Sequence, residues 1–248
     1  MTSPLAASLA EARRTRTRHR LSPEQTVRDP ASAYRVQAEV ARLLDVGIVG
    51  WKVGATPPPE RLPMAGPIFA CDLREDGGVY RLAPGEAVKV EVELGLRLAR
   101  DVPAGAVSRH EILSAASSIF VGIELVGSRY LDPDAAPFES RVADNFNNAA
   151  YVVGPSIASP AGLDLAALPC RLRIDGATVT DHVGGHADGD PLAPLLAWAA
   201  VQADLCGGLK AGQFVTTGTL NVPFDMNRAG LIEAELAGIG RVSLRLET

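Results

Sequence analysis

Hydrophobic positions follow different patterns near the start of the chain and in the rest of it. Residues 4–14 are rich in alanine, leucine and glutamate, and in residues 31–45 the apolar positions have helical spacing, so a helix is predicted in each segment. Ser32 is a candidate cap of the second helix and Gly47 a candidate stop. Beyond Gly47 short apolar runs are broken by glycine and proline, which is typical of strands joined by turns.

The later part of the chain has mainly the pattern of strands. Strands are predicted at 88–96, 119–126, 151–153, 170–174, 214–217, 231–236 and 242–246. The Gly-Ile-Gly sequence at 238–240 predicts a hairpin turn between the last two. One more apolar helix is predicted at 192–206, opened by Pro191 and closed by Gly207-Gly208.

The order of these elements predicts one α+β domain that spans residues 1–248. Residues 1–48 would form its helical part and residues 49–248 a mostly β body. The sequence shows no internal repeat, low-complexity tract or break in composition. Apolar residues make up 47% and charged residues 21%, as in an ordinary soluble globular protein. A chain of 248 residues can bury a substantial core without disulfides.

The charge of the chain argues against nucleic acid as a partner. The formal net charge is −5, whereas nucleic-acid affinity comes mostly from neutralising phosphates. One basic segment, residues 13–20, contains five arginines and a histidine. One interpretation is a basic arm that binds nucleic acid or a membrane. The other is a solvated face at the end of a helix and the segment by which the chain leaves it. We favour the second interpretation, because no aromatic residues interleave with the arginines.

The cysteines and the apolar runs bear on the cellular compartment. Cys71, Cys170 and Cys206 are far apart and form no CxxC pair, so neither a zinc site nor a disulfide framework is predicted. Free cysteines fit a reducing compartment. We find neither a signal-peptide pattern nor a run of about 18 uncharged apolar residues, the length that would span a membrane. A cytoplasmic protein without membrane contact is expected.

Two glutamates share one face of the strand predicted at 88–96. Its alternation places valine and leucine on one face and Glu91 and Glu93 on the other. Their side chains would be about 7 Å apart along the strand. Two carboxylates at this spacing can share a cation, and without one they repel each other. The alternative is a solvated polar face.

Glu124 lies in a strand that is apolar on both faces. A buried carboxylate needs a partner, a proton or a metal. The alternative to a metal is a buried salt bridge, for example with Arg129. Three carboxylates suit a hard cation such as Mg²⁺, which takes six oxygens, and would leave positions for a 2-oxo acid and water. No histidine pairs with these residues, which argues against zinc.

Six motifs occur in an order that resembles a known family. They are Gly50-Trp51-Lys52-Val53-Gly54-Ala55-Thr56, Val90-Glu91-Val92-Glu93, Ile123-Glu124-Leu125-Val126-Gly127-Ser128-Arg129, Val142-Ala143-Asp144-Asn145, Gly189-Asp190-Pro191-Leu192 and Leu209-Lys210-Ala211-Gly212-Gln213. The chain resembles the 2-keto-4-pentenoate hydratase and 4-oxalocrotonate decarboxylase branch of the fumarylacetoacetate hydrolase superfamily. The resemblance covers nearly the whole chain, from about Tyr34 to the end.

The resemblance implies a fold and a set of site residues. The fold would be an N-terminal helical segment followed by a mixed, rolled β-sandwich like the fumarylacetoacetase C-terminal domain, in a homo-oligomer. Glu91, Glu93 and Glu124 would bind Mg²⁺ or Mn²⁺. Lys52 would be an active-site cation that neutralises the site and, with a lowered pKa, moves protons; the alternative is an exposed strand-end lysine. Asp72 would match an acidic active-site residue, although its spacing is one residue longer than in hydratases.

The chain departs from the hydratase pattern in one loop. It has Gly189-Asp190-Pro191 where hydratases have Gly-His-Pro, and Thr180-Asp181-His182 where they have Ser-Ser-Gly. His182 would then contact the substrate, as would Gly218 and Thr219. The alternatives are surface loop histidines at 182 and 186 and a plain turn at 218–219. An acidic Asp181 would disfavour an anionic substrate unless it is paired or points away.

The leading hypothesis is a metal-dependent hydratase. It would add water to a 2-hydroxy-2,4-dienoate, giving a 4-hydroxy-2-oxo acid in aromatic catabolism. A 4-oxalocrotonate-type decarboxylase is the second hypothesis and needs a pocket for a second carboxylate. An acylpyruvate C–C hydrolase is the third and needs a base, often a His-Glu pair. A non-catalytic partner subunit of a hydratase–decarboxylase complex is the non-enzyme alternative, which the intact acidic cluster disfavours.

Overall fold

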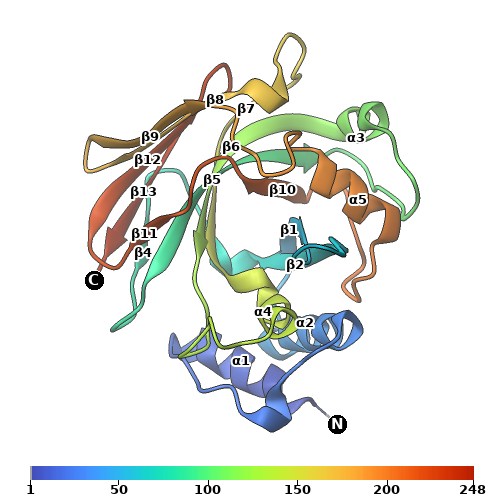
Figure 1. The fold of residues 1–248 in the computed structure, drawn as a ribbon, viewed down its shortest axis with the longest axis vertical. Helices are drawn as coiled ribbons and strands as arrows, with labels where there is room; N and C mark the ends of the chain where they lie inside the picture. Colours follow the sequence, from blue (N-terminus) through green and yellow to red (C-terminus); the bar gives the residue numbers. More distant parts are fainter. Residues whose placement is uncertain (1) are drawn as a thin grey trace.

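The computed structural model describes residues 2–248. Three helices gather at one end, α1 (Pro4–Thr15), α2 (Pro30–Leu44) and α4 (Phe138–Ala143), while α3 (Arg109–Ala115) and α5 (Ala193–Val201) flank the strands (Figure 1). The predicted mixture of N-terminal helices and a mostly β body is therefore confirmed. No helix within the described residues is long and apolar enough to cross a membrane.

The strands form a larger and a smaller sheet. The larger has the order β2 (Pro63–Phe69), β1 (Ile48–Ala55), β10 (Phe214–Thr219), β5 (Val88–Leu98), β6 (Ala116–Val126), β7 (Asn148–Ile157) and β3 (Leu73–Arg74), with β11 (Phe224–Met226) on β5. The smaller has the order β4 (Gly78–Arg81), β13 (Gly240–Glu247), β12 (Gly230–Leu236), β8 (Pro169–Ile174) and β9 (Ala177–Val183). Both are mixed, because β1 runs parallel to β10 and β4 to β13. The predicted final hairpin is confirmed, since β12 pairs antiparallel with β13.

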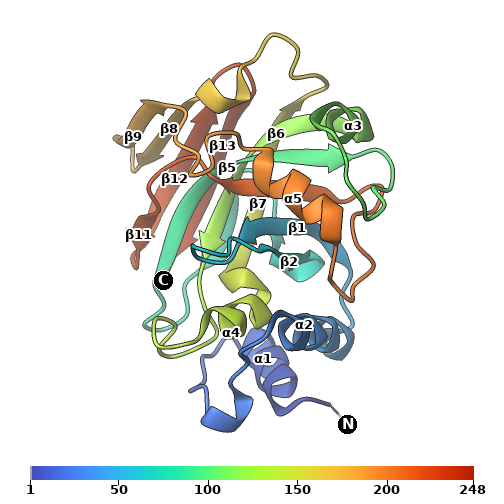
Figure 2. The same cartoon turned by 45° about the vertical axis from the view of Figure 1, so that its right-hand side comes forward.

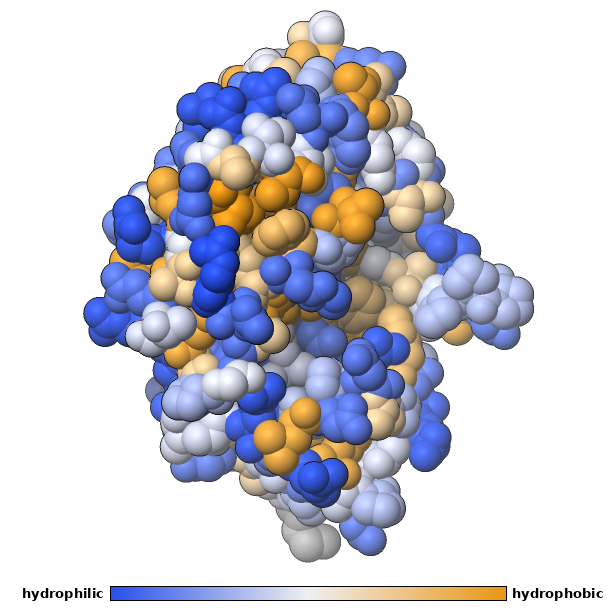
Figure 3. All heavy atoms as spheres, turned by 60° about the vertical axis from the view of Figure 1, so that its left-hand side comes forward, coloured by the Kyte–Doolittle hydropathy of each residue, from blue (hydrophilic) through white to orange (hydrophobic). Residues whose placement is uncertain are grey.

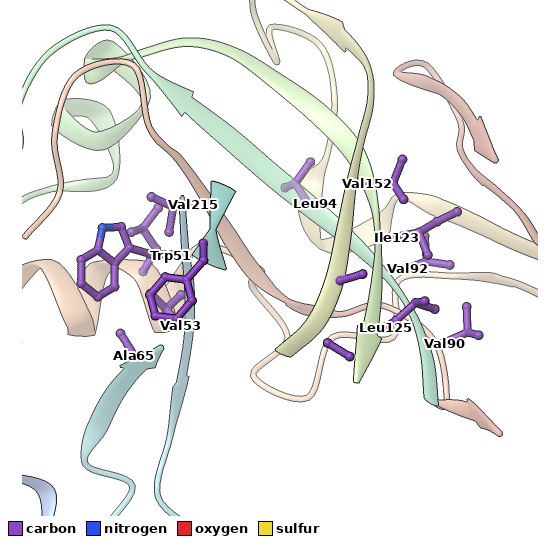
Figure 4. Packing of buried hydrophobic residues seen from close by; sticks show 14 of the residues in the cluster. Trp51, Val53, Ala65, Val90, Val92, Leu94, Ile123, Leu125, Val152 and Val215 are labelled. Carbon is purple, nitrogen blue, oxygen red and sulfur yellow. The ribbon is translucent and has the colours of Figure 1, made fainter. Parts of the chain in front are cut away.

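The outer face of the larger sheet forms most of the core. Val92, Ile123 and Val152 come from three adjacent strands, lie together and are fully buried (Figure 4). They pack toward the smaller sheet, since β13 contacts both β6 and β7. Elsewhere α5 crosses β1 and β10 (Figure 2), and Trp198 of α5 lies 6.5 Å from Trp51 between ring centroids.

The smaller sheet has one buried and one exposed face. Along β8, β12 and β13 buried positions alternate with positions that are more exposed. Hydrophilic side chains are interspersed with hydrophobic ones on this side of the molecule (Figure 3). The alternation is that of a sheet covering a core with one face.

The inner face of the larger sheet curls around a small aromatic cluster. Phe120, Tyr151, Phe214 and Ile68 come from four strands and are buried against one another. Glycine makes this curvature possible, because a Cβ at position 95 would lie 2.1 Å from the ring of Phe120. Comparable overlaps would occur at Gly50 with Phe214 and at Gly122 with Tyr151. The aromatic rings thus fill space that side chains on these strands would otherwise occupy.

Two helix boundaries differ from the prediction. The helix at 192–206 ends at Val201, because Gln202 adopts a left-handed conformation and its side chain donates to the carbonyl of Val102. Asp204 then accepts from two backbone N–H groups, a turn that competes with helix continuation. The cap of α2 is Asp29, whose carboxylate accepts from the N–H of Ser32.

Gly95→Ala tests the tight inner curvature. The added methyl would meet the ring of Phe120, which cannot retreat because Tyr151 and Phe214 enclose it. We expect the free energy of unfolding to fall by about 1–3 kcal/mol, measured by urea unfolding. Gly47→Ala is the control, since nothing lies within 4 Å of its added methyl. Equal stability of the two variants would contradict this account.

Candidate active site

Three carboxylates converge on the inner face of the larger sheet. Glu91 and Glu93 point to the same face of β5, and Glu124 of β6 is directly opposite Glu91. One oxygen from each of the three lies within 4.8 Å of one from each of the others. Glu93 and Glu124 are fully buried, whereas Glu91 is partly exposed. The solvated-face alternative is therefore wrong for Glu93.

Lys52 is the cation beside this cluster. Its Nζ donates to Oε1 of Glu124 at 3.0 Å, and the side chain is buried, so the exposed strand-end alternative is wrong. The ring of Phe146 lies under the ammonium group, 5.4 Å from Nζ to the centroid. The sequence suggested Arg129 as a salt-bridge partner of Glu124. This suggestion is wrong, because the partner of Glu124 is Lys52, and Arg129 donates through Nε to Asp144 at 2.6 Å.

Several buried polar atoms of the cluster have no partner. Both carboxylate oxygens of Glu93 and Oε2 of Glu124 accept no hydrogen bond from residues 2–248. The hydroxyls of Tyr151 and Thr216 lie near the Glu93 carboxylate, and the Thr216 hydroxyl partly offsets the rise in the pKa of Glu93 that burial causes. Neither hydroxyl has the geometry of a hydrogen bond to it. Unpartnered buried carboxylates are costly, and oxygens are the ligands of a hard divalent cation. The residues present therefore fit a divalent metal.

The pKa directions reflect this uncompensated charge. Burial, and then the charges of Glu124 and Glu91, raise the pKa of Glu93 well above its ordinary value. Burial also raises the pKa of Glu124, although Lys52 opposes the shift. For Lys52 burial lowers the pKa, but the three carboxylates outweigh it and the net shift is upward. We expected a lowered pKa for Lys52. In the absence of a metal, the three carboxylates raise it instead.

Asn148 links the cluster to a second group of charges. Its side-chain amide donates to Oε1 of Glu124 at 3.0 Å. Its backbone carbonyl accepts from Arg129 at 2.7 Å and from Arg13 at 3.4 Å. Arg129 also donates to the side chain and backbone of Asp144, and both residues are buried. This network fixes the start of β7, and with it the orientation of the Glu124 carboxylate.

A strained turn precedes Asn148. Asn145, Phe146 and Asn147 have φ values of 52°, 57° and 60°, in the left-handed region. Each such residue costs of the order of 1–3 kcal/mol, least for asparagine. The turn is held because Asn145 donates to the carbonyl of Pro67 at 2.9 Å. It places the Phe146 ring against Lys52 and Gly54.

The structure does not bring Asp72 to the carboxylate cluster. Asp72 ends the short 3₁₀ helix Ala70–Asp72 and pairs with Arg13 at 2.6 Å between Oδ2 and Nη1. Its carboxylate has no contact with Glu93, Glu124 or Lys52 among the interactions of the described chain. Its predicted catalytic role stays a prediction.

The residues predicted to contact the substrate lie on β9 and at the end of β10, and their role stays a prediction. Gly218 has φ of 104° and faces His186, whose Nε2 donates to the carbonyl of Thr217 at 2.8 Å. Thr219 is paired in register with Glu93, and its hydroxyl donates to Asn221. His182 is exposed on β9. His186 therefore lies against Gly218, while the ring of His182 lies beside Gly185, close to the carbonyl of Leu220.

The negative charge of Asp181 is neutralised by a neighbouring strand. Asp181 lies on β9 and pairs with Arg171 of β8 at 3.0 Å. A second ion pair, between Arg61 and Asp188, joins the loop 56–62 to the loop 184–190. The acidic residues of this region therefore have cationic partners of their own.

Comparison with known proteins identifies the family. The profile of the fumarylacetoacetate (FAA) hydrolase C-terminal family matches residues 57–247. The chain belongs to this family. It is 29% identical over 235 residues to a 2-keto-4-pentenoate hydratase of Paraburkholderia xenovorans strain LB400, covering 91% of this chain and 86% of that protein. It is 27% identical over 234 residues to a 4-oxalocrotonate decarboxylase of Pseudomonas putida, covering 90% and 86%.

A solved structure shows the same fold. The 4-oxalocrotonate decarboxylase from Pseudomonas putida G7, complexed with magnesium and adipate, has a TM-score of 0.85 at 23% identity, covering 99% of this chain and 97% of that one. The predicted family and branch are confirmed, and the chain is a lyase, as its hydratase and decarboxylase relatives are.

Several site residues of this family member escaped the sequence analysis. They are Phe146, Asn148, Tyr151 and Thr216. Tyr151 and Thr216 are polar residues within apolar strand runs, which is a usable signal of a buried polar group. The motif at 142–145 indicated the region of the turn but not which side chains face the carboxylates. Nothing in the sequence indicated that Asn148 belongs to the site, because its hydrogen bond to Glu124 depends on the pairing of β6 with β7.

Glu93→Gln separates metal binding from stability. Because the raised pKa of Glu93 disfavours its ionised form, the metal-free protein loses stability as pH rises through that pKa. The variant should therefore be more stable than the parent at neutral pH without metal, and should lose the stabilisation by Mg²⁺ or Mn²⁺, about 2.7 kcal/mol at a hundred times Kd. Thermal unfolding with and without metal measures both.

The control for this experiment is Glu233→Gln. Glu233 is a half-buried glutamate on β12 of the smaller sheet. It should keep the metal-induced rise in Tm. If Glu93→Gln kept the same rise, Glu93 would not be a ligand.

Proposed function

We propose that this lyase is a divalent-metal-dependent hydratase of a short 2-hydroxy-2,4-dienoate. The observation that supports it is the set of three carboxylates with unpartnered buried oxygens beside Lys52. The metal would be Mg²⁺, or Mn²⁺ in its place, with Glu91, Glu93 and Glu124 as ligands. The hydratase relative is covered over 86% of its length, which favours the same reaction here.

The reaction requires the substrate to ketonise and then to accept water. Water adds across a carbon–carbon double bond conjugated to the 2-oxo group, so one carbon gains the hydroxyl and its neighbour the proton. A bound divalent cation would supply Lewis acidity toward the carboxylate and 2-oxygen of the substrate. Lys52 would offset the remaining negative charge and hold a proton near the reacting atoms.

The other residues of the site would position these groups. Asn148 orients Glu124 by donating to Oε1, which leaves Oε2 free. Phe120 and Phe214 form an apolar floor that excludes water from one side. The hydroxyl of Tyr151 is buried beside Glu93 without a partner among the described residues and is available to a ligand.

The alternative reactions fit less well. A decarboxylase for a dicarboxylic acid needs a second cation, but Lys52 is paired with Glu124 and the loop residue Arg61 with Asp188. A C–C hydrolase needs a water-activating base, often a His-Glu pair, for which His182 and His186 are the candidates, and His182 is exposed on β9. Nε2 of His186 donates to a backbone carbonyl and Nδ1 accepts from a backbone N–H, so no carboxylate activates this ring.

The first test is ultraviolet loss of freshly generated 2-hydroxypenta-2,4-dienoate with Mg²⁺ and with excess chelator. We expect rapid, chelator-sensitive loss with formation of 4-hydroxy-2-oxopentanoate. Glu124→Gln should lower kcat/KM at least about a hundredfold, since several kcal/mol of charge stabilisation are removed. No turnover of the dienoate by the parent, but carbon dioxide release from 4-oxalocrotonate, would transfer the assignment to a decarboxylase.

Lys52→Met tests the proton-holding role separately from metal binding. The three carboxylates remain, so the metal-induced rise in Tm should persist, while kcat falls about a hundredfold or more. Lys210→Met is the control, because Lys210 pairs with Asp101 in an exposed ion pair. Turnover at the parental rate would show that the reaction needs neither the charge nor the proton of Lys52.

A further inference from the structure

A cavity of about 380 Å³ lies away from the carboxylate cluster. The end of α1 and the segment that follows it form one wall, and residues of 71–86 and 128–129 form the others. Its size is that of a small-molecule site. None of Lys52, Glu91, Glu93 and Glu124 lines it.

Arginine dominates the lining of this cavity, which we call the arginine cavity. The arginines are Arg13, Arg14, Arg16, Arg18, Arg74 and Arg129. Two carboxylates, those of Asp72 and Glu86, also line it, so six positive and two negative charges give a net charge of +4. The whole chain has a net charge of −5, so the positive field is concentrated here.

Three of these arginines have no carboxylate partner. Arg16, Arg18 and Arg74 form no salt bridge within residues 2–248. Arg18 donates to the carbonyl of Gly85, and Arg74 uses Nη1 for two backbone carbonyls, so each keeps free N–H donors. Guanidinium groups with free donors in a cavity match the oxygens of carboxylates and phosphates.

The arrangement around Tyr80 brings two of these cations together. Arg16 lies 5.2 Å and Arg74 5.9 Å from the centroid of the same Tyr80 ring. Tyr80 is itself buried, and its hydroxyl donates to Glu86 at 2.8 Å. The ring therefore holds both guanidinium groups at the cavity wall, where they repel each other unless an anion lies between them.

We propose that the arginine cavity binds a compact polyanion with two or more carboxylate or phosphate groups. Four arginines of the basic segment 13–20 gather around this partly open cavity rather than along an extended stripe: Arg13, Arg14, Arg16 and Arg18. The buried Arg13 and Arg129 are already paired with Asp72 and Asp144, which leaves Arg16, Arg18 and Arg74 to contact the ligand. This proposal does not depend on the hydratase activity.

Isothermal titration calorimetry tests the site with propane-1,2,3-tricarboxylate and with inorganic pyrophosphate, in buffer free of divalent metal. Acetate at equal ionic strength is the control ligand. We expect one of the two anions to bind with Kd below about 1 mM. The tighter of the two identifies the natural class as a polycarboxylate or a phosphate compound. Absence of saturable binding by both overturns the proposal.

Paired variants locate the binding. Arg16→Gln with Arg74→Gln should weaken it about tenfold or more, because charge-assisted hydrogen bonds are lost. Arg228→Gln with Arg241→Gln is the matched control, since both are exposed arginines of ion pairs elsewhere. Equal affinities of the two double variants overturn the proposal.

Cys71 provides a measurement on the unmodified protein. Cys71 is exposed and lines the arginine cavity, whereas Cys206 lies outside the cavity. Alkylation by the neutral reagent iodoacetamide is followed at each cysteine by mass spectrometry. A saturating anion should slow alkylation of Cys71 severalfold and leave Cys206 unchanged. An unchanged rate at Cys71 overturns the proposal even if the double variant fails to fold.

Discussion

Burial of Glu93 and Glu124 inside the curled sheet is the constraint on which the rest of the structure depends. Two fully buried carboxylates would oppose folding if nothing compensated them. Lys52 neutralises one charge, Asn148 hydrogen-bonds one oxygen, and the remaining oxygens fit a cation. The apolar outer face of the same strands provides the stabilisation that holds this interior in place.

The molecule separates its charges into two regions that share one residue. The inner face of the sheet is acidic, while the arginine cavity is strongly positive. Asn148 touches both, because its amide meets Glu124 and its carbonyl meets Arg13 and Arg129. The buried Arg129–Asp144 pair keeps this residue fixed between them.

Much of the fold was predictable from local patterns. The alternation at 88–96 fixed the face of Glu91 and Glu93, and the apolar run around Glu124 predicted its burial. β1 was not delimited, because Gly50 and Gly54 interrupt its apolar pattern. The partners of Lys52 and Arg129 were not predictable, since register between strands distant in sequence decides them. The ion pair between Asp72 and Arg13 was unpredictable for the same reason, because the two residues are 59 positions apart in the sequence.

The glycines packed against the aromatic cluster limit how the carboxylate site can diversify among descendants of this gene. Every larger residue at position 50, 95 or 122 collides with a ring that is itself enclosed. A single substitution at any of these positions therefore costs stability before it can reshape the site. The loops 56–62 and 184–190, which the Arg61–Asp188 ion pair joins, lie outside the strands and are free of this constraint.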